Sequence, residues 1–252
     1  MIQITQLQKG KKIFFISDLH LPLQMSSKTN NSCREDKVIA WLNYIQPQAE
    51  ALFLLGDIFD FWFEYKYLIP KGALRFQAKL LSFCEEKIPV YFFLGNHDYW
   101  AKDYLMHVSG VQIFRAPLSV CICNKRFLIG HGDTINPTRS YSLLLKLYHN
   151  ALLQHLAKLL PADWLYGMVD YYCLKKNNRK KDWDLGQEDR ILHYCKTEIE
   201  PSMHHDFYIF GHMHTPCIKA INHTSYYCNL GDWITHYTYG CFDGLVFSLL
   251  KF

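Results

Sequence analysis

The chain has 252 residues, of which 50% are hydrophobic and 16% are aromatic. This composition excludes an intrinsically disordered chain, and the length suits one α/β domain with a full core. The net charge of +4 is too small to indicate a nucleic-acid partner by itself.

The lack of a recognisable targeting signal and the pattern of cysteines predict a cytoplasmic protein. No apolar run approaches the ~20 residues of a membrane-spanning helix, and residues 1–12 lack the apolar core of a signal peptide. The nine cysteines include no Cys-x-x-Cys pair. We therefore expect free thiols in a reducing compartment.

The first half of the chain alternates between predicted strands and helices. Three short, almost wholly apolar runs, 13–17, 51–55 and 90–94, are typical of strands buried on both faces. Residues 35–45 and 73–86 lie between them and have the apolar spacing of helices. This order predicts parallel pairing through crossover helices, with ligands bound at the carboxyl ends of the strands.

The rest of the chain follows another pattern. Residues 119–123 and 126–129 predict a hairpin around Asn124-Lys125, and residues 141–173 predict two leucine-rich helices divided by Pro161. A further helix is expected over 187–198. Four strands are expected over 207–210, 217–221, 226–230 and 245–250. We interpret residues 1–252 as a single domain with a helical cap insertion at about 138–200.

Five short motifs, each at the end of an apolar run, carry the candidate chemistry. They are Asp18-Leu19-His20, Gly56-Asp57 with Asp60, Gly95-Asn96-His97-Asp98, Gly130-His131-Gly132-Asp133 and Gly211-His212-Met213-His214. Alone, a His-x-His or a Gly-Asp is usually structural, but together the motifs offer carboxylate, imidazole and amide ligands. Such mixed ligands suit Mn²⁺, Fe²⁺, Zn²⁺ or Co²⁺. Two such ions ~3.5–4 Å apart can promote the hydrolysis of a phosphate ester.

In this order the motifs resemble those of calcineurin-like metallophosphoesterases, over nearly the whole chain. The resemblance implies a four-layer α-β-β-α sandwich, in which two mixed sheets pack together between helices. It also implies two divalent metal ions, with Mn²⁺ as the first candidate. One ion would be held by Asp18, His20, Asp57 and His214, and the other by Asp57, Asn96, His131 and His212.

His97 and Asp98 are the predicted catalytic residues. His97 is not among the implied ligands, and beside Asp98 it is well placed to be held in one tautomer. It would then donate a hydrogen bond or a proton to the reacting phosphate. The alternative is a purely structural histidine.

A narrower resemblance concerns the substrate. Residues 56–62, 131–134 and 230–233 are similar to the branch of the family that hydrolyses UDP-2,3-diacylglucosamine in lipid A synthesis. In the enzymes of that branch, water attacks the phosphorus on the uridine side, and UMP and 2,3-diacylglucosamine 1-phosphate are released. A helical cap in these enzymes holds the acyl chains. The resemblance implies a nucleotide-linked glycolipid substrate and contact with the inner leaflet of the cytoplasmic membrane. The candidate substrate-binding residues are Asn96, His97, Tyr141, Lys175, Lys176 and Arg179.

Alternatives to this substrate remain open. Well-known members of the branch carry Arg where this chain has His97, and an acidic pair that this chain lacks before Tyr141. The same core could belong to a soluble metal-dependent phosphodiesterase or phosphatase acting on another nucleotide or phosphoester, although the apolar insertion argues against it. Leucines at helical spacing are more often core than lipid site, and basic residues such as those over 175–181 are usually solvated. An inactive interaction module is disfavoured because every ligand position is filled. The oligomeric state stays open.

Overall fold

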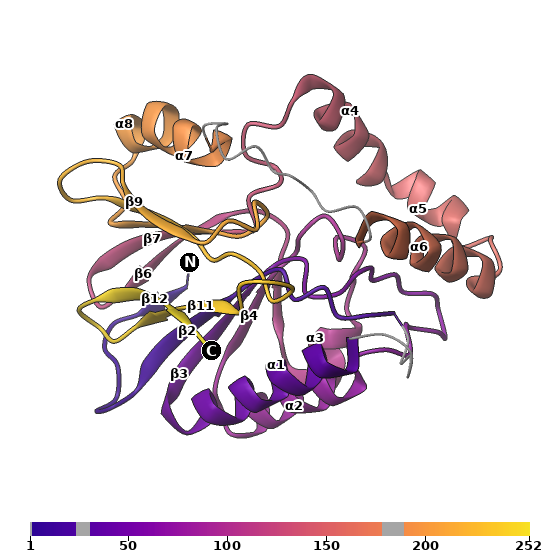
Figure 1. Ribbon diagram of the computed structural model, residues 1–252, viewed down its shortest axis with the longest axis horizontal. Coiled ribbons are helices and arrows are strands. Elements are labelled where there is room, and N and C mark those ends of the chain that lie inside the picture. Colours follow the sequence, from indigo (N-terminus) through magenta and orange to yellow (C-terminus); the bar gives the residue numbers. More distant parts are fainter. Residues whose placement is uncertain (1, 24–30, 178–188) are drawn as a thin grey trace.

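A computed structural model describes residues 2–23, 31–177 and 189–252, which form two six-stranded sheets packed together (Figure 1). In spatial order, the first sheet comprises β1 (Gln3–Ile4), β6 (Leu118–Ile122), β7 (Lys125–Ile129), β8 (Phe207–Phe210), β10 (Tyr226–Asn229) and β9 (Cys217–Ala220). The second comprises β12 (Phe247–Lys251), β11 (Thr238–Phe242), β2 (Lys12–Ile16), β3 (Ala49–Leu55), β4 (Val90–Phe93) and β5 (Gln112–Phe114).

The strand directions confirm the predicted mixed sheets. The strands β2, β3, β4 and β5 are parallel neighbours, while β11 runs antiparallel to β2. In the first sheet, β7, β8 and β10 are parallel and β6–β7 is the predicted hairpin. Aromatic side chains fill the space between the sheets: the rings of Phe15 and Phe53 stack at 5.0 Å, and those of Phe127 and Phe207 at 4.8 Å.

Helices cover the outer face of each sheet. The second sheet packs on α1 (Asn31–Ile45) and α2 (Leu74–Glu85), which Figure 1 shows beside α3 (Tyr104–Ser109). The 3₁₀ turn η1 (Gln46–Gln48) leads from α1 into β3. The first sheet is covered by α7 (Arg190–Tyr194), the π-turn η2 (Cys195–Ile199) and α8 (Glu200–Ser202). These layers are the ones expected of the predicted sandwich.

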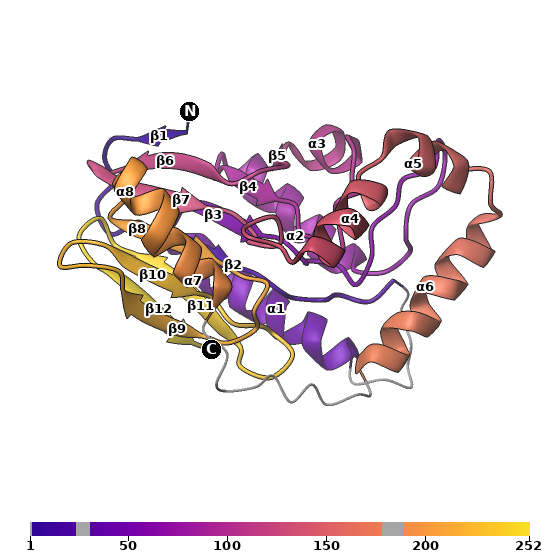
Figure 2. The same cartoon turned by 90° about the horizontal axis from the view of Figure 1, so that it is seen from above.

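Between β7 and β8 the chain forms α4 (Arg139–Tyr148), α5 (Ala151–Ala157) and α6 (Ala162–Asn177), at one end of the molecule (Figure 2). The prediction of two helices divided at Pro161 was incomplete, because Asn150 begins a further helix. Its side chain accepts hydrogen bonds from the amides of Leu152 and Leu153.

The cap helices α4–α6 expose most of their leucines. The inward residue Leu165 packs beside Phe61 and Phe63, and the Tyr166 hydroxyl donates to the Phe63 carbonyl at 2.6 Å. The exposed apolar residues are Leu143, Leu144, Leu147, Leu152, Leu153, Leu156, Leu159, Leu160, Trp164, Met168 and Tyr171. Among the described residues, no helix is long and apolar enough to cross a membrane.

Candidate metal centre

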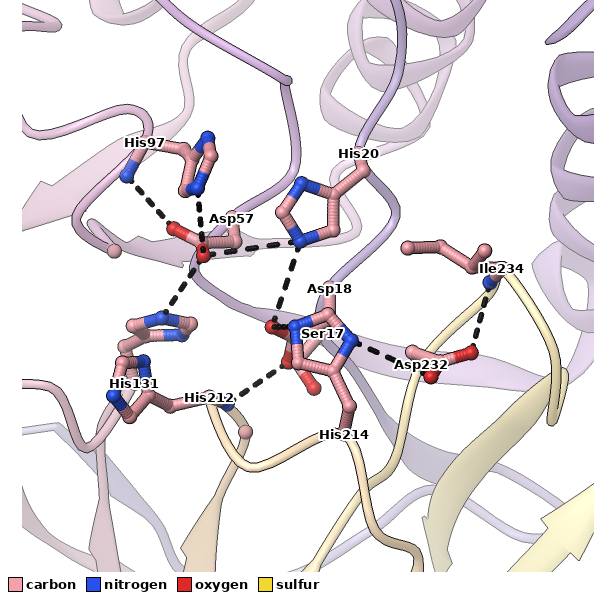
Figure 3. A network of polar contacts seen from close by, with 12 residues as sticks. Ser17, Asp18, His20, Asp57, His97, His131, His212, His214, Asp232 and Ile234 are labelled. Atoms are coloured by element: carbon pink, nitrogen blue, oxygen red, sulfur yellow. Dashed lines mark hydrogen bonds and ion pairs between the residues drawn. The ribbon is translucent and has the colours of Figure 1, made fainter. Parts of the chain in front are cut away.

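The five motifs meet at the carboxyl ends of neighbouring strands. Asp18 follows β2, Asp57 follows β3, and His131 follows β7, so each lies in the loop that leaves its strand. Because these strands run parallel within each sheet, their carboxyl ends lie at the same edge. Figure 3 shows the resulting cluster, in which side chains from both sheets face one another.

Six of the seven predicted ligands form two compact groups. The first group contains Asp18, His20 and His214; the second contains Asp57, His131 and His212. In each group the candidate ligand atoms all lie within 4.8 Å of one another. Asp57 lies between the groups, because its Oδ2 is 3.9 Å from His20 Nε2 and 3.4 Å from His131 Nε2. A carboxylate in this position could contact an ion in either group, and the bridging role of Asp57 stays a prediction.

Unsatisfied polar atoms show that the cluster fits metal ions. Among the described residues, four buried atoms here have no hydrogen-bond partner: Asp18 Oδ1, His20 Nε2, Asn96 Oδ1 and His131 Nε2. Buried polar atoms without partners are costly, so four at one edge indicate a ligand-binding site. All four are nitrogen or oxygen donors of the kind that bind first-row divalent cations. The residues present therefore fit a pair of divalent metal ions.

Partners on the far side of three imidazoles direct the ligand nitrogens inward. His131 Nδ1 donates to the carbonyl of Leu55 at 2.8 Å. In the other group, His20 Nδ1 lies 3.3 Å from Asp60 Oδ1, and His214 Nδ1 lies 3.4 Å from Asp232 Oδ2. Each contact leaves Nε2 facing the cluster, as metal-ligating histidines require.

The pKa values of the two histidines in the second group are shifted in opposite directions. Burial lowers the pKa of His212 to about 3, and the charge of neighbouring His131 acts in the same direction. Burial also disfavours a charged His131, but the Asp57 carboxylate outweighs it and raises the pKa of His131. One imidazole is therefore neutral at any physiological pH, as a metal ligand must be.

The backbone brings these side chains together in an unusual conformation. Five of the candidate ligands have left-handed φ angles: Asp18 (53°), His20 (47°), Asp57 (50°), His212 (66°) and His214 (55°). Two glycines beside the ligands allow the loops of the centre to approach one another closely. A Cβ atom on Gly95 would come within 2.3 Å of Asp57 Oδ1, and one on Gly211 within 2.4 Å of Asp18 Oδ2. Larger residues at these two positions would displace the ligands.

His97 is oriented by a different partner from the predicted one. Its Nδ1 lies 2.6 Å from the backbone carbonyl oxygen of Asp60, which fixes the ring and leaves Nε2 4.0 Å from Asp57 Oδ2. The Asp98 carboxylate instead accepts from the amides of Gly95 and Ile58, at 2.6 and 2.7 Å. Burial, and then the charge of Asp57, raise the pKa of Asp98 to about 7. Asp98 thus holds two of the loops together, and the catalytic roles of both residues stay predictions.

The predicted substrate-binding residues are only partly described. Tyr141 lies in the first turn of α4, and its ring centre is 6.3 Å from that of His212. The backbones of Lys175 and Lys176 belong to α6, but their side chains lie outside the described residues. Arg179 lies outside the described residues altogether. Asp232 was not predicted as a site residue, although its Gly-Asp sequence after a strand repeats the signal of Asp57.

Comparisons with known proteins agree with this geometry. A family model described as calcineurin-like phosphoesterase matches residues 11–216. A Porphyromonas gingivalis protein named UDP-2,3-diacylglucosamine hydrolase is 31% identical over 94% of this chain and 96% of its own length. A Yersinia pestis protein of the same name is 29% identical over 87% and 90%. A structure described as a novel archaeal phosphodiesterase shares the fold, with a TM-score of 0.50, 16% identity and coverage of 96% of this chain and 99% of that one.

Proposed function

Since the chain belongs to the calcineurin-like phosphoesterase family and is a metal-dependent hydrolase, we propose that its substrate is UDP-2,3-diacylglucosamine. Water would attack the phosphorus on the uridine side. A new P–O bond to water then forms as the bond to the bridging oxygen breaks. The products are UMP and 2,3-diacylglucosamine 1-phosphate, which carries away the bridging oxygen.

One observation carries this proposal: an exposed apolar helical segment begins at the metal centre. Tyr141 of α4 stacks near His212, and the leucines that follow it are open to solvent, with 58% of Leu144 and 50% of Leu147 exposed. Exposed apolar surface of this extent is typical of a binding site rather than of a core. We propose that the cap helices hold the acyl chains while the metal centre receives the pyrophosphate.

The residues at the centre can be given roles in this reaction. Two divalent cations, for which we propose Mn²⁺, would lower the pKa of a water molecule and neutralise phosphate charge when bound. Asp18, His20, Asp57 and His214 would hold one cation, and Asp57, Asn96, His131 and His212 the other. His97, whose Nδ1 faces the Asp60 carbonyl, presents Nε2 to the centre. Because Nδ1 donates to that carbonyl, His97 would act in its doubly protonated form, and its Nε2–H would donate a hydrogen bond to a phosphoryl oxygen as charge develops.

The same surface supports a location at the membrane. A substrate with two acyl chains resides in a bilayer, and the enzyme must reach it from the aqueous side. We propose that the exposed leucines and Trp164 contact the cytoplasmic face of the inner membrane peripherally.

Hydrolysis assays with matched substrates test the assignment. With Mn²⁺ present, we expect kcat/KM for UDP-2,3-diacylglucosamine to fall by orders of magnitude when both acyl chains lose several carbons, at ~0.8 kcal/mol per buried CH₂. Hydrolysis of bis-p-nitrophenyl phosphate needs only the metal centre and provides the reference. Equal activity on long-chain, short-chain and deacylated substrates would refute the proposal and favour a soluble phosphodiesterase.

A double variant of the cap gives the complementary test. Leu144→Asn with Leu147→Asn should reproduce the effect of chain shortening, with unchanged hydrolysis of the small diester. Because both side chains are at least half exposed, the stability of the fold should change by less than about 1 kcal/mol. Leu245→Asn with Val246→Asn, a pair that is 84% and 58% exposed in the turn between β11 and β12, is the matched control.

A further inference from the structure

The first turn of α1 carries an arginine that contacts the metal centre from outside. Arg34 is partly buried, and its Nη1 donates a hydrogen bond of 2.6 Å to the carbonyl oxygen of His20. His20 is a candidate ligand in a left-handed conformation, so its backbone requires external support. The hydrogen bond fixes the peptide that follows this ligand.

Two carboxylates beyond the ligands belong to the same half of the centre. Asp60 Oδ1 lies 3.3 Å from His20 Nδ1, and Asp232 Oδ2 lies 3.4 Å from His214 Nδ1. The His20 and His214 rings stack with centres 5.2 Å apart, and both belong to the group that contains Asp18. Each of these two ligands is therefore oriented by a negatively charged partner.

Among the described residues, Arg34 is a positive charge near enough to interact with both carboxylates. Burial lowers the pKa of its guanidinium, and the opposing contributions come from Asp60 first, then from Tyr237 and Asp232. One turn further along α1, the Lys37 ammonium lies 3.5 Å from the ring centre of Tyr237. The Tyr237 amide donates to the Asp232 carbonyl, so α1 also holds the loop that carries Asp232.

The other half of the centre is supported differently. His131 is oriented by the carbonyl of Leu55, a neutral group that belongs to strand β3. Its orientation follows from the sheet and does not depend on a carboxylate that needs a counter-charge. The two halves should therefore respond differently to the loss of a positive charge on α1.

We propose that Arg34 is a positioning residue for one of the two metal sites, the one formed with Asp18, His20 and His214. It fixes the His20 carbonyl and compensates the charges of Asp60 and Asp232, the two carboxylates that orient the ligating imidazoles. The inference rests on the proposed two-metal function, but it concerns the binding of metal and not the identity of the substrate.

Titration of the metal-free, full-length protein with Mn²⁺ tests this role. Calorimetry should resolve two bound ions in the wild type, and electron paramagnetic resonance should show the coupled signal of a Mn²⁺ pair. In Arg34→Gln we expect the affinity for one ion to fall ~10-fold or more while the other changes by less than about threefold. At limiting Mn²⁺ the coupled signal should give way to that of a single ion. Arg34→Lys keeps the charge and should recover most of the lost affinity.

A charge-matched control separates this role from a general effect of charge. Arg75 of α2 pairs with Asp36, an exposed residue of α1. Arg75→Gln therefore also removes one positive charge beside α1, and it should leave both Mn²⁺ affinities unchanged. Equal weakening of both ions in Arg34→Gln, or no weakening, would overturn the proposal. If Arg34→Gln does not fold, Arg34→Met, which removes the charge and keeps the apolar stem, decides: a loss confined to one ion supports the role, and equal losses or none overturn it. The titration contains neither nucleotide nor lipid, so failure of the substrate assignment would leave its result intact.

Discussion

Two polar clusters lie at opposite ends of β8 and differ in how their atoms are satisfied. At the amino end, Glu200 accepts hydrogen bonds from the side chains of Tyr208, His204, Asn222 and Ser225, at 2.5 to 2.9 Å. At the carboxyl end, the metal centre leaves four buried polar atoms without a hydrogen-bond partner among the described residues. The first cluster is complete in the protein alone, whereas the second is complete only with a ligand. Hydrogen-bond satisfaction thus separates a structural cluster from a functional one.

The largest effect should follow from the loss of the bridging carboxylate. Asp57→Ala should lower kcat by at least about 10³-fold, which corresponds to the loss of roughly 4 kcal/mol of transition-state stabilisation. Bound metal should be lost with activity, because Asp57 is the one side chain placed in both proposed ligand sets. Metal analysis of the purified variant checks this, and near-normal occupancy of both sites would contradict the bridging assignment.

A smaller loss is expected from His97, which lies at the centre but outside the ligand sets. His97→Ala should reduce turnover by ~10²-fold, the usual contribution of a positioned proton donor. Metal content should be unchanged, and it serves as the control for an intact centre. Unchanged turnover would make His97 a structural residue.

Removal of the metal should lower the stability of the fold, because the buried polar atoms of the centre then have no ligand to bind. Because Mn²⁺ binds only the folded chain, a concentration 100-fold above Kd should stabilise it by about 2.7 kcal/mol, or roughly 5–10 °C in Tm. Thermal unfolding with chelator and with Mn²⁺ measures the difference. Asp57→Ala is the matched control and should show little shift; an equal shift would place the stabilising ion elsewhere.

The complete cluster should respond to pH and not to metal. Although burial opposes it, hydrogen bonds from Tyr208 and the neighbouring groups lower the pKa of Glu200 from 4.5 to about 2. A depressed folded-state pKa stabilises the fold above the unfolded value, and this stability is lost as pH falls from about 4.5 towards 2. Glu200→Gln should therefore cost about 2 kcal/mol at pH 7 and progressively less below pH 4.5.

Unfolding at several pH values, with and without Mn²⁺, checks the last prediction. Activity at pH 7 should stay at the wild-type level because Glu200 lies at the opposite end of β8 from the centre. A difference between Glu200→Gln and wild type that persists unchanged to pH 2 would argue against a stabilising carboxylate.

Much of the sandwich could be predicted because strands buried on both faces require continuous apolar runs, as in β2, β3 and β4. The strand β11 was missed for a physical reason. It contains Gly240, where a Cβ atom would come within 2.8 Å of the Phe247 ring. Close packing requires glycine there, yet glycine in a sequence usually indicates the end of a strand.

The ligands of the centre could be predicted because each requires a side chain of a particular type after a strand. The groups that orient them could not be predicted to the same extent. His131 and His97 are held by the backbone carbonyls of Leu55 and Asp60, which carry no sequence signal. Arg34 belongs to an ordinary amphipathic helix, and only the packing of α1 brings it to the His20 carbonyl.

The left-handed backbone at five candidate ligands sets stability against function in this protein. Aspartate and histidine tolerate that conformation better than most residues, but each still carries a cost of about 1 kcal/mol that glycine would not. Glycine in place of Asp18 or His214 would relieve the backbone and delete a ligand in the same step. Selection for a more stable fold alone would therefore erase the centre one residue at a time, because at these positions the substitution that relieves the backbone also removes a ligand.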